Sequence, residues 1–251
     1  MKKSLSILSA LGCLLATSAM AQDAASPVTA NVALTSSYKY RGQDQGDNRP
    51  AISGGFDYSK NGFYVGNWNS SIKFAGSLEM DVYAGYKGEY SGFGYDVGVL
   101  TYYYPERNKA VSFNTTELYG ALTYSILTFK YSHTVSKDYF GIGESLQQTN
   151  SLGSRPSGRN TGYYDLSANY PLMDKLTLNA HVGFTRYSSD LRDVVPTGGT
   201  AIPNYTDYKI GATYDLGGGF SGSAAYVGAN KKDFYGRINQ GRVIVAISKT
   251  L

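Results

Sequence analysis

Residues 78–103 show a regular alternation of apolar and polar positions. Every second residue is apolar over 78–86, and the alternation resumes over 93–99, after a turn that contains Gly92. A period of two residues is typical of a strand with two unlike faces, and a short glycine-containing turn joins two such strands as an antiparallel hairpin. The pattern therefore predicts a hairpin of two strands.

The apolar face of this hairpin carries aromatic rings at both ends. Tyr86, Phe93 and Tyr95 lie near the turn, and Tyr103 lies at the far end. Rings in these two places are typical of strands that cross a bilayer, because amphipathic rings settle at both headgroup levels. We therefore interpret the hairpin as one unit of a transmembrane β-barrel.

Alternation and turn signals recur along the chain and predict twelve strands. Their expected ranges are 29–40, 51–59, 63–72, 78–88, 93–104, 113–124, 126–137, 162–171, 176–187, 205–215, 220–230 and 241–251. Tight turns follow the even-numbered strands, and mostly longer, polar loops follow the odd-numbered ones. Sorted connections of this kind are typical of outer-membrane barrels, whose short turns are periplasmic. We expect an all-β protein, a transmembrane antiparallel up-and-down β-barrel of about 12 strands, with short periplasmic turns and long extracellular loops.

The N-terminus has the organisation of a secretory signal peptide. Two lysines precede an apolar stretch at residues 7–16, and Ala19-Met20-Ala21 supplies a small-residue cleavage site. We expect residues 1–21 to be removed, leaving residues 22–251 as a single outer-membrane barrel domain. No later stretch approaches the roughly 18 apolar residues of a transmembrane helix, whereas a barrel strand needs only about 9–11 residues.

Composition agrees with an exported β protein. The 251 residues include 24 tyrosines and 30 glycines, and the net charge of +4 falls to +2 without the two signal lysines. The only cysteine, Cys13, lies in the signal, so the mature chain has no disulfide, catalytic thiol or thiolate metal site. We expect no nucleic-acid partner.

Residues 31–70 carry a distinctive set of short motifs, with an Asn-Val start, an Arg-Gly pair, Pro-Ala, Gly-Gly-Phe and Gly-Phe-Tyr-x-Gly-x-Trp-x-Ser. These motifs consist of Asn31, Val32, Arg41, Gly42, Pro50, Ala51, Gly54, Gly55, Phe56, Gly62, Phe63, Tyr64, Gly66, Trp68 and Ser70. The set resembles the opening signature of the TorF-type porin family of proteobacterial outer-membrane proteins, and further matches occur at 102–105, 117–119, 178–183 and 248–250. Leu251 stands where a phenylalanine is more usual in that family. The resemblance implies an outer-membrane barrel with pore function and brings no established substrate.

Charged residues of both signs alternate with the apolar positions and are expected to face the barrel lumen. The predicted pore-lining residues are Lys39, Arg41, Asp57, Glu79, Asp81, Lys87, Asp96, Glu117, Lys130, Asp165, His181, Asp207, Lys209 and Arg242, and Asn67 and Asn69 are assigned to the same face. Facing acids and bases would set a transverse field on passing solutes. In the alternative interpretation, the same groups pair with one another and merely fill a closed interior.

The expected strand number suggests a narrow conduit. Eight strands close around a lumen filled by side chains, whereas sixteen or more leave an aqueous channel. We predict passive diffusion of small hydrophilic solutes or ions through a narrow polar lumen, and the alternative is a closed structural or adhesion barrel without conduction. Loop 138–161 is long enough to fold inward, but its polar content suits a mobile external loop better.

A barrel enzyme is a third possibility, for which the sequence offers no site. The chain contains only two histidines, and alternation places His181 inward and His133 on the outer side. No Gly-x-Ser-x-Gly or His-Glu-x-x-His motif occurs, and the acidic loop 44–48 lacks the ligand spacing of a calcium loop. We expect no enzymatic activity, catalytic residue, metal site or cofactor.

Basic residues in the long loops suggest contact with anionic lipopolysaccharide. They are Arg49, Arg107, Lys109, Arg155, Arg159, Lys231, Lys232 and Arg237. The expected partners are therefore outer-membrane lipid, lipopolysaccharide and small hydrophilic solutes, and the expected location is the bacterial cell outer membrane.

Overall fold

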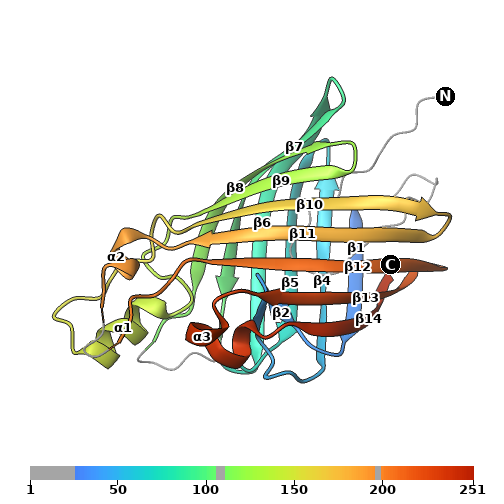
Figure 1. Ribbon diagram of the computed structural model, residues 1–251. Helices are drawn as coiled ribbons and strands as arrows, with labels where there is room; N and C mark the ends of the chain where they lie inside the picture. Colours follow the sequence, from blue (N-terminus) through green and yellow to red (C-terminus); the bar gives the residue numbers. More distant parts are fainter. Residues whose placement is uncertain (1–25, 106–110, 196–198) are drawn as a thin grey trace.

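The computed structural model describes residues 26–105, 111–195 and 199–251, which form a closed barrel of twelve antiparallel strands (Figure 1). The barrel strands are β1 (Val28–Thr35), β4 (Ala51–Lys60), β5 (Phe63–Ser71), β6 (Leu78–Tyr90), β7 (Phe93–Tyr103), β8 (Thr115–Tyr124), β9 (Leu127–Thr134), β10 (Gly162–Met173), β11 (Leu176–Arg186), β12 (Tyr205–Gly217), β13 (Phe220–Ala229) and β14 (Arg242–Thr250). Each strand pairs with its neighbours in chain order, and β14 pairs with β1 to close the barrel. The predicted twelve-stranded fold is confirmed, and the predicted signal peptide lies outside the described residues.

The connections are sorted between the two ends of the barrel, as predicted. Five hairpins close through two-residue turns, and in one of them Asn61 and Gly62 have φ of 52° and 85°. Two consecutive positive φ values match the right-handed twist of the flanking strands, which explains the Asn-Gly sequence. The other end carries the long loops, with the short helices α1 (Ile142–Asn150), α2 (Ser189–Arg192), α3 (Lys232–Tyr235) and η1 (Gly236–Asn239) (Figure 1).

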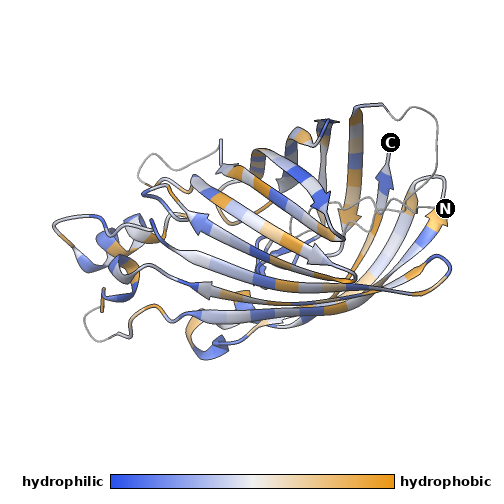
Figure 2. Ribbon diagram, turned by 90° about the horizontal axis from the view of Figure 1, so that it is seen from above, coloured by the Kyte–Doolittle hydropathy of each residue, from blue (hydrophilic) through white to orange (hydrophobic). Residues whose placement is uncertain are grey.

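The outer face of the barrel is apolar. Hydrophobic and polar residues alternate along the strands in Figure 2, and the hydrophobic ones on the outer face are exposed. They include Val32, Leu34, Ile52, Phe56, Val65, Val82, Val97, Val99, Leu118, Leu122, Phe129, Leu166, Val182, Ile210, Val243, Val245 and Ile247. A continuous apolar surface of this extent marks a face that meets an apolar environment. No helix among the described residues is long and apolar enough to cross a membrane.

Aromatic rings border this apolar face at both ends of the barrel. Near the short turns, the ring pairs Phe63–Tyr86 and Phe93–Tyr124 each have centroids 4.8 Å apart. Towards the long loops, Tyr131 and Tyr164 lie 4.8 Å apart and Tyr208 and Tyr226 lie 6.1 Å apart. Two such girdles flanking an apolar band are the arrangement found in membrane-spanning barrels.

Residues 36–50, which we call the inward hairpin, turn into the barrel instead of prolonging the first strand. The prediction of a strand over 29–40 was wrong at its end, because β1 stops at Thr35 and a separate hairpin follows, with β2 (Lys39–Tyr40) paired to β3 (Gln43–Asp44). At its tip, Arg41 and Gly42 have φ of 45° and 74°. These left-handed conformations form a tight turn, so the chain reverses where alternation alone suggests a straight strand.

Candidate functional site

The inward hairpin crosses the lumen and is anchored to the far wall by a buried ion pair. The Arg41 guanidinium donates two hydrogen bonds to the Glu117 carboxylate on β8, at 3.0 and 2.7 Å, and the side chains are 5% and 2% exposed. It also donates to the Tyr139 hydroxyl at 3.1 Å and lies 4.1 Å from the centroid of the Tyr163 ring. A bidentate pair combined with stacking fixes both the position and the orientation of the tip.

A second set of contacts joins the inward hairpin to β6 and β7. The Tyr38 hydroxyl donates to Glu79 Oε1 at 2.7 Å, and Tyr104 donates to Glu79 Oε2 at 2.6 Å. The hydroxyl groups of Tyr40 and Tyr102 also hydrogen-bond with each other. Glu79 therefore holds the hairpin through Tyr38, and the two buried hydroxyl donors satisfy the carboxylate without a cation.

The opposite side of the hairpin tip packs tightly against β12 and β13. A Cβ atom on Gly42 would lie 2.5 Å from Cβ of Asp207 and 2.7 Å from the carbonyl oxygen of Gly228. The Lys39 ammonium donates to the carbonyl oxygens of Gly42 and Ile238, each at 3.0 Å. The hairpin thus contacts walls on both sides of the lumen.

Burial changes the pKa of the Lys39 side chain. Burial lowers the pKa of the Lys39 ammonium to about 8. The carboxylate of Asp44 raises this pKa, whereas the neighbouring cations Arg242 and Lys232 lower it. Lys39 therefore loses its charge at a lower pH than an ordinary surface lysine does.

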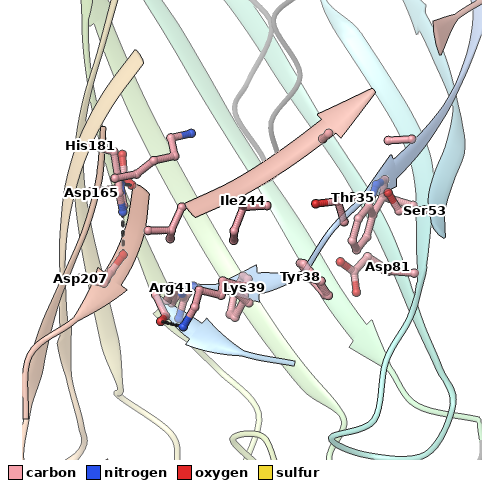
Figure 3. A pocket seen from close by; sticks show the side chains of 18 of the residues that line it. Thr35, Tyr38, Lys39, Arg41, Ser53, Asp81, Asp165, His181, Asp207 and Ile244 are labelled. Atoms are coloured by element: carbon pink, nitrogen blue, oxygen red, sulfur yellow. Dashed lines mark hydrogen bonds and ion pairs between the residues drawn. The ribbon is translucent and has the colours of Figure 1, made fainter. Parts of the chain in front are cut away.

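A carboxylate–imidazole–carboxylate chain lies on the wall formed by β10, β11 and β12 (Figure 3). Nδ1 of His181 lies 2.5 Å from Asp165 Oδ2, and Nε2 lies 2.6 Å from Asp207 Oδ1. The Tyr163 hydroxyl donates to both oxygens of Asp207, at 3.1 and 3.2 Å. Both imidazole nitrogens are occupied by carboxylates, so neither is left to activate a serine as a general base.

Tyrosines partner the charged groups nearer the short turns. Tyr64 donates to Asp96 at 2.5 Å, and Tyr83 donates to Asp57 at 2.6 Å. The Lys87 ammonium lies 5.5 Å from the centroid of the Tyr64 ring. The interior is therefore a network of tyrosines and charges rather than a ring of one sign.

The remaining predicted residues also have defined positions. Lys130 Nζ lies 4.0 Å from the centroid of the Tyr119 ring, and Lys209 pairs in register with His181. Arg242 is at the long-loop end, where it donates to the Gln240 side chain at 3.4 Å. Asp81 is buried on β6.

A cavity of about 170 Å³ lies between the inward hairpin and the barrel wall (Figure 3). The predicted residues that line it are Lys39, Arg41, Asp81, Lys130, Asp165, His181, Asp207 and Lys209. The others, which lie away from it, are Asp57, Glu79, Lys87, Asp96, Glu117 and Arg242. The structure thus brings together eight of the fourteen residues around one cavity.

The assignment of Asn67 and Asn69 to the lumen was wrong. On β5 the buried inward positions are Tyr64, Trp68 and Ser70, and the two asparagines alternate with them on the outer face. The asparagine side chains hydrogen-bond with each other at 3.0 Å, so their amides are satisfied by each other. A shift of one residue exchanges the two faces of a strand, and polarity alone chose the wrong one here.

Sequence reasoning also missed the aromatic part of the cavity wall. Tyr38, Trp68, Tyr102 and Tyr163 all line the cavity. Their signal was the same alternation that placed Asp81 and Asp165 inward, because Tyr102 pairs in register with Asp81 and Tyr163 lies two residues before Asp165 on β10. Large rings belong in this lumen because a hairpin fills it and gives them surfaces to pack against.

Loop 138–161 does not enter the lumen as the main constriction. It contains α1, and the Arg155 guanidinium binds both Asp138, at 3.0 Å, and Glu144. Only its first residues reach inward, where Tyr139 meets Arg41 and Phe140 packs against Tyr102. The constriction comes mainly from the inward hairpin.

Comparison with known proteins places the chain in a family. Residues 21–250 match the family described as "Bacterial protein of unknown function (Gcw_chp)". The chain belongs to this family. This match does not confirm the more specific TorF-type resemblance, and no curated protein matches the sequence.

Solved structures show that the Gcw_chp barrel shares its fold with porins. The NanC porin is 13% identical with a TM-score of 0.53, and the alignment covers 89% of this chain and 98% of NanC. A structure described as the "KdgM porin in complex with disordered oligogalacturonate" is 9% identical with a TM-score of 0.50, over 88% of this chain and 97% of that one. At these identities the likeness concerns the fold alone.

Proposed function

We propose that this protein is a porin-type channel of the bacterial outer membrane, through which small hydrophilic solutes or ions diffuse passively. The observation that carries the proposal is a closed barrel with an apolar outer face and a charged, tyrosine-rich interior. An apolar belt between two aromatic girdles suits a bilayer, and an interior of fixed charges suits polar solutes.

The location and orientation are part of the same proposal. Residues 1–21 would direct export, and residues 22–251 would form the single barrel domain. The short turns would face the periplasm and the long loops the cell exterior, as in other outer-membrane barrels. The resemblance to TorF-type porins supports this assignment, and the porin fold gives no reason to expect enzymatic activity.

The proposed conduit is narrow because the inward hairpin occupies its long-loop end. The fourteen charged residues predicted to line the pore would act on both sides of this constriction. The cavity of about 170 Å³ beneath the hairpin would be a transient binding position for solutes on their path through the barrel. Selectivity would arise from the mixture of acids and bases rather than from one charged ring.

A closed structural or adhesion barrel is the second candidate, and one specific observation favours it. The inward hairpin is held on both sides, by the Arg41–Glu117 pair and by the close packing of Gly42 against Asp207. A hairpin fixed in this way would block conduction if it never moved.

Planar-bilayer recording separates the two candidates. The wild-type barrel would be compared with a variant in which residues 38–48 are replaced by a short Gly-Ser linker. Steady single-channel current in the wild type is the expected result. Current only in the linker variant would favour the closed barrel. If neither protein conducts although both are correctly folded, the channel proposal is wrong.

Lipopolysaccharide remains a proposed partner of the long loops. Arg49, Arg159, Lys231, Lys232 and Arg237 are exposed there, whereas Arg107 and Lys109 lie outside the described residues. Arg155 is already paired with Asp138 and Glu144 and is a weaker candidate. Titration of the detergent-purified protein with divalent-stripped lipopolysaccharide tests this contact, and absence of binding would remove it.

A further inference from the structure

One buried carboxylate in the lumen, that of Asp81, has an oxygen without a hydrogen-bond partner among the described residues. Asp81 is 2% exposed and lines the cavity (Figure 3). Among the described residues, no group hydrogen-bonds to its buried Oδ1, and none forms an ion pair with it. A buried carboxylate is costly without a donor or a cation, so the site is incomplete as it stands.

The register neighbours of this carboxylate on both adjacent strands are aromatic. Asp81 pairs in register with Trp68 on β5 and with Tyr102 on β7, so the three side chains stand side by side on the inner wall. The inward hairpin adds Tyr38, whose ring meets Trp68 edge-on with centroids 5.5 Å apart. All four residues line the cavity. A carboxylate next to aromatic side chains in one cavity is a combination that suits organic ammonium groups.

The protein's own nearby cations are engaged elsewhere. Arg41, at the hairpin tip, is held by both oxygens of Glu117. The Lys130 ammonium lies over the Tyr119 ring. Glu79, on the same strand as Asp81, is bound by two tyrosine hydroxyls and adds to the acidic character of this wall. Lys39, which also lines the cavity, donates to two backbone carbonyl oxygens, and no ion pair joins Asp81 to a cation among the described residues.

The cavity is large enough for such a ligand. Its volume of about 170 Å³ exceeds the roughly 150 Å³ of an engineered cavity that takes up benzene. A compact ammonium ion with a few alkyl groups is of comparable size, whereas a long oligomer would not be enclosed.

We propose that Asp81, Trp68, Tyr102 and Tyr38 form a binding subsite for a small organic ammonium ion on the route through the barrel. The proposal rests on the proposed channel function for access from solution, and it names the solute class. Asp81 supplies the negative charge, and the rings of Trp68, Tyr102 and Tyr38 contact the alkyl groups around the nitrogen.

The chain carries its own probe of this subsite. Trp68 is the only tryptophan among the 251 residues, so intrinsic fluorescence reports on this one place. Folded protein in detergent would be titrated with choline chloride, with sodium chloride as the salt control. The neutral isostere 3,3-dimethyl-1-butanol has the same shape without the charge. We expect a saturable emission change with choline, about tenfold weaker binding of the neutral alcohol and no response to sodium.

A conservative substitution tests the role of the charge. Asp81→Asn should weaken choline binding about tenfold. The matched control Glu89→Gln removes a carboxylate from the exposed turn end of the same strand and should leave the choline response unchanged. Equal responses of the wild type and Asp81→Asn would overturn the proposal. If Asp81→Asn fails to fold, equal binding of choline and the neutral alcohol by the wild type overturns it without any variant.

Potassium chloride conductance of the same preparation separates this proposal from the channel function. If the barrel conducts but does not respond to choline, the subsite proposal is wrong and the channel proposal stands. If the barrel responds to choline but never conducts, the subsite proposal stands and the channel proposal is wrong.

Discussion

Arg41 and Glu117 join two parts of the chain that lie 76 residues apart, and their side chains meet inside the barrel through two hydrogen bonds of 3.0 and 2.7 Å. Arg41 belongs to the inward hairpin and Glu117 to the wall strand β8. Because the pair is buried, it is a strong single link between the hairpin and the far wall of the lumen.

Breaking this pair should loosen the constriction. Glu117→Gln leaves the Arg41 charge buried without its counterion, a change that costs about 3–5 kcal/mol. We expect a larger single-channel conductance and faster proteolysis of the hairpin, measured in planar bilayers and by limited digestion. Arg49→Ala is the matched control, because Arg49 lies in the same segment in an exposed pair 3.8 Å from Asp47. Unchanged conductance in folded Glu117→Gln would show that other contacts hold the hairpin.

The hairpin tip should tolerate no side chain at position 42. Gly42→Ala would place Cβ 2.5 Å from Cβ of Asp207, at a φ of 74° that already disfavours alanine. We expect a displaced hairpin, detected as higher conductance and as a new cleavage site in limited proteolysis. Gly92→Ala controls for backbone strain, since Gly92 has a φ of 83° and no atom within 4 Å of the added Cβ. Similar behaviour of the two variants would contradict the packing argument.

Selectivity should change between pH 7 and pH 9 through Lys39. Because burial lowers the Lys39 pKa to about 8, its ammonium is charged below that pH and neutral above it. Loss of this positive charge from the hairpin should shift permeability towards cations as the pH rises. Reversal potentials across a potassium chloride gradient measure the shift, and Lys39→Met should diminish it. An undiminished pH response in Lys39→Met would assign the titration to another group.

Much of the fold followed from alternation, because a barrel strand has two chemically different faces and each short turn has its own signature. All twelve strands and the sorting of connections were predictable from these local signals. The inward path of residues 36–50 was not, since Tyr38 to Arg41 alternate like a strand. Its inward path depends on the positive φ of Arg41 and Gly42 and on partners distant in sequence such as Glu117.

The site was predictable in part for the same reason. Alternation identified charged residues such as Asp165, His181 and Asp207, but not that they bind one another, because sequence gives the face of a strand and not the relative heights of distant strands. Strand β5 shows the limit of polarity as a guide. There Trp68 faces inward and Asn67 outward, since the packed hairpin makes the interior receptive to large rings.

Replacing His181 should destabilise the barrel more than replacing the other histidine. Asp207 is fully buried, and its Oδ1 hydrogen-bonds to His181 Nε2 at 2.6 Å. His181→Gln therefore leaves the carboxylates of Asp165 and Asp207 without the imidazolium that donates to both. We expect a loss of about 3–5 kcal/mol, measured by urea unfolding in lipid vesicles. His133→Gln is the matched control: His133 is on the outer face, with a hydrogen bond to the Tyr131 hydroxyl at 3.0 Å, and its loss should cost about 0.5 kcal/mol. The double variant His181→Gln/Asp207→Asn should recover part of the loss, because it removes the most deeply buried of the orphaned charges. Equal stability of the two single histidine variants would mean that the carboxylates are compensated by some other group.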